Sequence, residues 1–221
     1  MSGHSHFAES TEEYLEAVYR LEREGPGVTT SGLASELGVA PASVSGMLKK
    51  LAAEGYVEQV ARGEVRLTQK GLEVGVRVVR RHRLAERLLT DVLGMAWDEV
   101  QQEACMLEHA ISENVERRLI DVLGDPKECP HGLPIPPKDL TDPQRDSVPL
   151  AQVDIGSSAV VRGVTHEVPE MLRYLGEVGL RPGAQVHVHA KAPLGGPLTV
   201  EVQHKRHAIS LELARMVLVS E

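Results

Sequence analysis

Aromatic residues and cysteines are scarce in this chain, and long apolar runs are missing. Only 3% of the 221 residues are aromatic, so the cores must be built from Leu, Val, Ala and Met. No apolar run approaches the roughly 20 residues that cross a bilayer, and the N-terminus lacks the apolar stretch of a secretion signal. We therefore expect a cytoplasmic protein without membrane contact. Its two cysteines are better interpreted as thiolate ligands than as a disulfide.

Charge is distributed unevenly along the chain. The net charge of −8 opposes DNA binding, but residues 40–90 carry ten Lys and Arg against five acids. Residues 91–150 carry five Lys and Arg against thirteen acids. DNA responds to a local basic patch rather than to the total charge. The acidic segment, in turn, attracts cations.

The N-terminal part of the chain has a helix-turn-helix pattern. Apolar residues recur at helical spacing and predict helices over residues 11–24, 31–37 and 41–54, with Gly or Pro between them. Strand patterns follow at 56–60 and 64–68, joined by a basic turn, and predict the wing of a winged helix. A generic three-helix core is the alternative, but it leaves the hairpin unexplained.

Candidate DNA contacts lie on the third predicted helix and at the tip of the wing. They are Ala42, Ser43, Ser45, Gly46, Lys49, Lys50 and Arg62. Small residues allow a helix to approach the floor of the major groove and contact thymine methyl groups. The Lys and Arg side chains are expected to hold phosphates. Because Gly46 offers no side chain for reading bases, DNA shape is expected to contribute to specificity.

Helices and then short strands are predicted for the rest of the chain. Apolar spacing predicts a long helix over 69–93 and two more over 97–111 and 112–123. Their apolar positions exceed the needs of one small core, which predicts a surface for a second subunit. A proline-rich linker that cannot be helical follows. From about residue 148, short strands with Gly and Pro turns predict a small β-barrel. The predicted fold is mainly α with a small β part.

Five side chains with metal-binding donor atoms occur within 28 residues. His82 and Glu86 share one helix face, and Cys105, Glu108 and His109 cluster on another, because residues three or four apart lie above one another. Imidazole, thiolate and carboxylate groups are the usual ligands of divalent transition metals. A solvated helix has no need of this set. The spacing predicts a divalent-metal site.

The same region resembles the diphtheria toxin repressor family of metal-dependent regulators. The resemblance rests on the motifs at 81–91, 103–109 and 115–119, and on Cys129-Pro-His131 in the linker. The last 70 or so residues resemble the barrel of the iron-transport accessory protein FeoA.

This resemblance implies four parts and a function. Residues 1–74 correspond to a winged helix-turn-helix, 75–136 to a helical metal-binding and dimerisation domain, 137–149 to a linker and 150–221 to an SH3-like β-barrel. It implies a homodimer that senses Mn²⁺ or Fe²⁺ and then binds a palindromic operator in double-stranded DNA. The regulated genes are expected to serve metal homeostasis, with repression the expected sign of regulation.

The resemblance also implies two metal ions per subunit. The first site is expected to use Glu13, Glu16, His82, Cys105, Glu108 and His109. Ligands from two domains would fix the relative pose of those domains; the alternative is that the two acids of the first helix are merely solvated. The carboxylate of Glu13 favours Mn²⁺, whereas the Cys105 thiolate favours Fe²⁺ or softer ions. We expect Mn²⁺, with Fe²⁺ as the close alternative.

The second site is expected to use the linker motif. Its predicted ligands are Glu86, Cys129 and His131, with Glu167 or Glu170 from the barrel, and His166 as a further possibility. The alternative for Cys129 is a small buried hydrophobic residue.

Two other functions are open from the sequence. A winged-helix regulator could respond to an organic effector or use Cys105 as a redox thiol, but the cluster of Glu, His and Cys then has no explanation. A metallohydrolase could hold a metal with an open position. That alternative leaves the winged helix without a role, and the chain has no phosphate loop or nucleophile elbow. We predict that the chain is not an enzyme.

Overall fold

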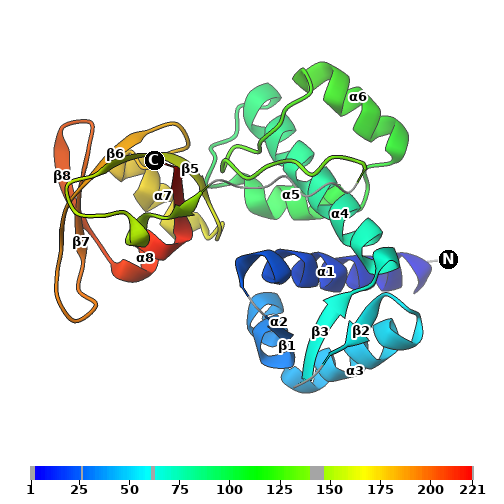
Figure 1. Cartoon of the computed structure of the whole chain (residues 1–221). Helices are drawn as coiled ribbons and strands as arrows, with labels where there is room; N and C mark the ends of the chain where they lie inside the picture. The colour runs from blue at the N-terminus through cyan, green and yellow to red at the C-terminus, as the bar shows by residue number, and fades with distance from the viewer. Residues whose placement is uncertain (1–2, 26, 61–62, 140–146, 221) are drawn as a thin grey trace. The chain divides into compact units, whose positions relative to one another are not determined.

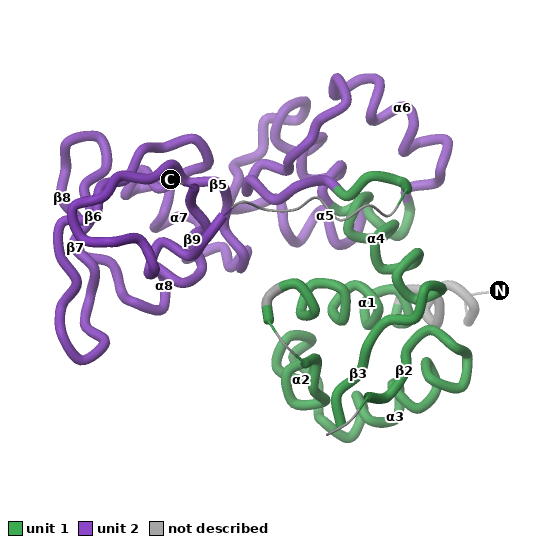
Figure 2. Tube along the Cα trace, in the orientation of Figure 1, with its two compact units in different colours: residues 1–82, 108–110, 136–142 green, residues 83–107, 111–135, 143–221 purple. Residues whose placement is uncertain are grey.

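The structure is a computed structural model that describes residues 3–25, 27–60, 63–139 and 147–220. The chain divides into two compact units (Figure 2). The first comprises residues 1–82, 108–110 and 136–142, and the second comprises residues 83–107, 111–135 and 143–221. The chain passes from one to the other inside a single helix, between His82 and Arg83.

The first unit contains the predicted helix-turn-helix and its hairpin (Figure 1). Its helices are α1 (Gly3–Glu24), α2 (Thr30–Leu37), α3 (Pro41–Ala53) and the first part of α4 (Gln69–Arg87). Its strands are β1 (Val28–Thr29), β2 (Val57–Gln59) and β3 (Glu64–Leu67), antiparallel in the order β1-β3-β2. The winged arrangement is confirmed. The two-residue strand β1 is an addition that the sequence pattern did not predict.

Local sequence signals explain where these helices begin and end. The Thr29 hydroxyl accepts a hydrogen bond from the Gly32 N–H and caps α2, which ends at Gly38 in the left-handed conformation. Pro41 occupies the first turn of α3, where its missing N–H costs nothing. α3 buries Val44 and Leu48 against α1 and α2, and this leaves its opposite face exposed.

The helices of the second unit form a separate small core. α4 continues into a π-helical segment (Leu88–Val92), followed by α5 (Val100–Glu108) and α6 (Glu113–Leu123). The Ser112 hydroxyl caps α6 by accepting a hydrogen bond from the Val115 N–H. The buried residues of this core include Leu84, Leu89, Val100, Ala104 and Leu119. Several apolar side chains of the same region are exposed, namely Val92, Leu93, Met106, Val115 and Val122.

Residues 124–135 form a loop after α6, the linker loop, which backbone hydrogen bonds hold in place. The Cys129 N–H donates to the Leu133 carbonyl at 2.8 Å, and the Ile135 N–H donates to the Lys127 carbonyl at 2.7 Å. The Arg83 guanidinium of α4 donates to the Pro134 carbonyl. Prolines exclude a helix here, and these hydrogen bonds pair backbone N–H and carbonyl groups that helical hydrogen bonds would otherwise pair.

The C-terminal part is a six-stranded antiparallel sheet with short helices. Its strands are β4 (Val148–Pro149), β5 (Ser158–Val164), β6 (Gln185–Lys191), β7 (Leu198–Val202), β8 (Lys205–Ile209) and β9 (Val217–Ser220), in the order β4-β9-β5-β6-β7-β8. α7 (Pro169–Val178), α8 (Leu211–Met216) and a 3₁₀ turn (Leu150–Gln152) complete it. Inward-facing Val and Leu side chains alternate along the strands and form its core.

Trp97 explains why α5 begins later than the apolar spacing predicted. Its side chain is 6% exposed and belongs to the core of the C-terminal sheet rather than to that of the helices. The Arg181 guanidinium lies over its ring at 4.6 Å, and Asp98 pairs with Arg173 of α7 at 3.2 Å. Trp97 and Asp98 therefore contact the C-terminal sheet domain, and the helix starts at Val100.

In the described part of the chain, no helix has the length and apolar character needed to span a bilayer.

Candidate metal centres and DNA-binding helix

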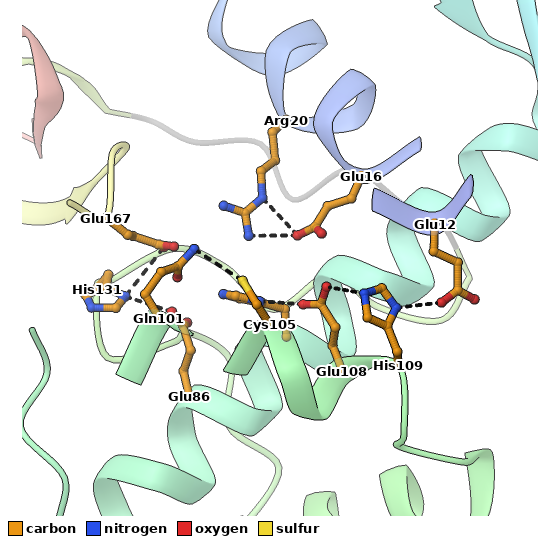
Figure 3. A network of polar contacts seen from close by, with 11 residues as sticks. Glu12, Glu16, Arg20, Glu86, Gln101, Cys105, Glu108, His109, His131 and Glu167 are labelled. Atoms are coloured by element: carbon orange, nitrogen blue, oxygen red, sulfur yellow. Dashed lines mark hydrogen bonds and ion pairs between the residues drawn. The ribbon is translucent and has the colours of Figure 1, made fainter. Parts of the chain in front are cut away.

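The first group of predicted ligands centres on His82 and Glu108, and Figure 3 shows Glu108 among its neighbours. Both side chains are buried, at 0% and 3% exposure. The Nδ1 atom of His82, on α4, lies 2.5 Å from Oε2 of Glu108, the last residue of α5. Burial raises the pKa of Glu108, although the hydrogen bond to His82 opposes that shift.

Glu16 of α1 joins this pair. It is buried, and Arg20 one turn later donates to it, with Nη2 at 2.7 Å and Nε at 3.0 Å from Oε1. Burial disfavours its charge, but the charges of Arg20 and His82 outweigh burial and lower the pKa of Glu16. Hydrogen bonding by Glu108 contributes to this lowering of the Glu16 pKa. Two buried carboxyl groups near one another are more stable when they share a proton or a cation.

His109 extends the group to a residue that the sequence interpretation missed. Its Nε2 atom lies 3.3 Å from Oε1 of Glu108, and its Nδ1 atom lies 2.8 Å from Oε2 of Glu12 (Figure 3). Glu13, which was the predicted ligand, is exposed. Glu12 and Glu16 are four residues apart and share a face of α1, a spacing that could have drawn attention to Glu12.

Cys105 lies one turn before Glu108 on α5 and is exposed. Its Sγ atom accepts a weak hydrogen bond from Gln101 Nε2 at 3.9 Å. Residues three apart on a helix are neighbours, so the thiol and the Glu108 carboxylate are on the same side of α5.

The second group brings together Glu86, Cys129, His131 and Glu167. One donor atom of each lies within 4.8 Å of those of the other three, and all four residues are buried. Glu86 comes from α4, Cys129 and His131 from the linker loop, and Glu167 from the turn before α7. The chain therefore folds three separate segments around one point.

His131 has a defined orientation in this group. Its Nε2–H donates to the Trp97 carbonyl at 2.7 Å, and Nδ1 lies 3.0 Å from Oε1 of Glu86 and 3.5 Å from Oε1 of Glu167 (Figure 3). A histidine that donates one ring N–H to a carbonyl presents the other nitrogen as a ligand. No sequence pattern indicated that a backbone carbonyl at Trp97 would set this orientation.

The charges of this group match a divalent cation. Burial disfavours a charged His131, but hydrogen bonds to Cys129, Glu167 and Glu86 outweigh burial and raise the pKa of His131. Burial and the nearby Glu86 raise the pKa of the Cys129 thiol. A cation at the centre would offset both carboxylates and stabilise the thiolate. The donor set of two carboxylates, an imidazole and a thiol therefore fits a metal ion.

The remaining second-site candidates lie outside this group. Glu170 is exposed at the start of α7. His166 is half-buried, and its Nδ1 atom lies 3.0 Å from the Thr165 hydroxyl.

Most of the predicted DNA contacts lie on the exposed face of α3. Five of them are exposed, and Lys50 is half-buried. The Ser45 hydroxyl donates to the Pro41 carbonyl one turn earlier. A Cβ atom at Gly46 would meet nothing within 4 Å, so packing does not require glycine there. The wing-tip candidate, Arg62, lies outside the described residues.

Family models match consecutive parts of the chain. Residues 6–65 match the N-terminal DNA binding domain of iron dependent repressors, and 68–137 match their metal binding and dimerisation domain. Residues 148–221 match the FeoA domain. The iron-dependent repressor IdeR of Mycobacterium tuberculosis is 35% identical over 226 residues, which cover 96% of this chain and 97% of that protein.

The chain belongs to the iron-dependent repressor family. A second family member, the diphtheria toxin repressor of Corynebacterium efficiens, is 34% identical over 81% of this chain and 83% of its own length. This membership confirms the predicted family, with its DNA-binding, dimerisation and FeoA domains. It also supports a regulator rather than an enzyme.

Solved structures of the family are similar to the whole chain. A manganese-dependent transcriptional repressor in complex with manganese matches with a TM-score of 0.90 and 31% identity, over 96% of this chain and 99% of its own. ScaR with bound Cd²⁺ matches with a TM-score of 0.83 and 29% identity, over 96% and 99%. The predicted fold class is confirmed.

Proposed function

We propose that the chain is a homodimeric, metal-dependent transcriptional repressor of the cytoplasm. It binds Mn²⁺, with Fe²⁺ as the close alternative, and then a palindromic operator that controls metal-homeostasis genes. The observation that carries this proposal is that the chain buries two clusters of carboxylate and histidine side chains. The first contains His82 and Glu108, and the second contains Glu86, His131 and Glu167. The same proposal divides the chain into four parts, which end at residues 74, 136, 149 and 221.

The first site is proposed to take its ligands from α1, α4 and the end of α5. His82, Glu108 and Glu16 are all buried, and the His82 imidazole lies at hydrogen-bonding distance from the Glu108 carboxylate, a pair of groups that can bind one divalent ion. The full proposed set is Glu13, Glu16, His82, Cys105, Glu108 and His109. Glu13 is retained on the family resemblance alone, because its side chain is exposed.

The second site is proposed to be Glu86, Cys129, His131 and Glu167, which gives two ions per subunit. Its support is the mutual proximity and burial of four donor groups. Of the two barrel acids considered, Glu167 is favoured because it is buried beside His131, whereas Glu170 is exposed.

The mixture of carboxylate and thiolate ligands favours a divalent ion of intermediate hardness. Carboxylates outnumber thiols in both proposed sites, which favours Mn²⁺ over softer ions. One thiolate in each site favours Fe²⁺. When bound at the first site, the metal would supply positive charge between the acids of α1 and Glu108. It would thereby hold the DNA-binding helices in one pose.

DNA binding is proposed to use the exposed face of α3. Ala42, Ser43, Ser45 and Gly46 make that face small enough to lie close to base edges. Lys49 and Lys50 of α3 and Arg62 of the wing are proposed to hold phosphates. The open space at Gly46 supports this assignment, since the fold has no packing reason for a glycine there.

A metal-titrated DNA-binding assay tests the proposal. The purified chain is mixed anaerobically with fluorescent promoter DNA and with Mn²⁺, with Fe²⁺, or with a chelator, and anisotropy is measured. DNA affinity should rise sharply with either ion and disappear with the chelator. Equal affinity in all three conditions would overturn metal sensing and favour an organic or redox effector.

Replacing Glu13 by methionine tests what sets the metal preference. A thioether is a softer ligand than a carboxylate, so Glu13→Met should move the preference from Mn²⁺ towards Fe²⁺. The check is the ratio of the two ion concentrations that half-saturate DNA binding, compared with wild type. An unchanged ratio would show that Glu13 does not contact the ion.

A further inference from the structure

The two ring nitrogens of His109 face two different carboxylates. Nε2 lies 3.3 Å from Oε1 of Glu108, and Nδ1 lies 2.8 Å from Oε2 of Glu12. A neutral imidazole has one N–H donor and one nitrogen lone pair. When Nδ1–H donates to Glu12, the lone pair of Nε2 points towards Glu108 and the proposed first site.

Glu12 is itself held in place from a second side. Its other carboxylate oxygen, Oε1, lies 3.8 Å from Nη2 of Arg77 on α4. The Glu12 side chain is 21% exposed, and that of His109 is 14% exposed, so water competes only partly for this contact. Each Glu12 oxygen therefore has its own partner.

We propose that Glu12 is a positioning residue for the first metal site. It accepts the Nδ1–H of His109, selects the tautomer in which Nε2 carries the lone pair, and makes that nitrogen a stronger ligand. Carboxylates behind metal-binding histidines act in this way. The proposal rests on the proposed function, because it needs an ion among His82, Glu108 and His109.

A regulatory consequence follows from the place of Glu12 on α1. An ion on Nε2 withdraws electrons from the ring, so the Nδ1–H becomes a stronger donor and its bond to Glu12 strengthens. Metal binding would thereby tighten a contact between the segment at His109 and the first helix of the DNA-binding domain. Glu12 would contribute to the metal response without binding the ion.

The tautomer of His109 tests the positioning role without metal. In ¹⁵N NMR spectra of the metal-free protein, recorded above the pKa of His109, which Glu12 and Glu108 raise, the ring should be protonated at Nδ1 alone in wild type and should become a mixture of tautomers in Glu12→Ala. Glu12→Gln, whose amide oxygen still accepts a hydrogen bond, should restore the wild-type tautomer. Glu36→Ala removes an exposed acid of α2 and should change nothing.

Metal affinity tests the consequence for the site. In calorimetric titrations with Mn²⁺, the first-site step is the one that Glu108→Gln removes. That step should weaken about 10–100-fold in Glu12→Ala, the usual cost of losing such a partner, with partial recovery in Glu12→Gln. Unchanged affinity or an unchanged tautomer in Glu12→Ala would overturn the proposal. If wild type itself shows no first-site step, the proposed function is wrong. If wild type shows the step and Glu12→Ala leaves it unchanged, only the positioning role of Glu12 is wrong.

Discussion

Glu108→Gln is expected to abolish the response of DNA binding to metal while the chain still folds. Glutamine keeps the size of the side chain and can still hydrogen-bond to His82, but it removes the negative charge that faces the proposed ion. Losing even an outer-shell partner costs about 10–100-fold in metal affinity, and losing a charged ligand should cost at least that. The measurement is anisotropy of operator DNA over a Mn²⁺ titration.

The same substitution should not lower the stability of the metal-free protein. Burial raises the pKa of Glu108 above 4.5, its ordinary value in the unfolded chain. A raised carboxyl pKa means that folding favours the protonated form, so ionisation of Glu108 lowers the free energy of unfolding. This penalty is absent at low pH and grows as the pH rises towards the folded pKa. At neutral pH, Glu108→Gln removes that penalty.

Melting temperatures in chelator at pH 5 and pH 7 check the sign. Wild type should lose more stability than Glu108→Gln on going from pH 5 to pH 7. Glu36→Gln, the same change at an exposed position, should behave as wild type does. A clear loss of stability in metal-free Glu108→Gln, or a retained Mn²⁺ response, would show that Glu108 has a structural role instead.

Helices and their order could be predicted because their signals are local. Apolar periodicity, the Ser112 cap and the turn at Gly38 each act within a few residues. For the same reason, helical spacing alone placed Glu108 beside His109 and Cys105. The pairing of His82 with Glu108 spans 26 residues, yet donor chemistry was enough to suggest it.

Features that depend on distant packing could not be predicted. Which of Glu12 and Glu13 faces His109 depends on the rotation of α1, and periodicity does not fix that to one residue. The start of α5 depends on Trp97 joining the barrel core. The hairpin before β8 turns through Gln203 and His204, both with positive φ, and neither residue is a usual signal for such a turn.

Gly132→Ala is expected to destabilise the second unit more than Gly156→Ala does. Gly132 has a φ of +80°, and a Cβ atom there would lie 2.0 Å from the Arg162 carbonyl oxygen of β5. The left-handed conformation costs a non-glycine residue about 1–2 kcal/mol. Overpacking against a backbone that cannot move freely adds about 1–3 kcal/mol. Urea unfolding should show both costs together.

Gly156→Ala is the matched control, because Gly156 has a φ of +88° but nothing within 4 Å of its added Cβ. It should lose only the conformational part, about 1–2 kcal/mol. Equal losses in the two variants would mean that the linker does not approach β5 so closely. The metal site gives a second readout, because the carbonyl of His131, next to Gly132, accepts the Val164 N–H at 3.0 Å. Moving Gly132 away from β5 should draw His131 from Glu167 and weaken second-site metal binding, whereas Gly156→Ala should leave that binding unchanged.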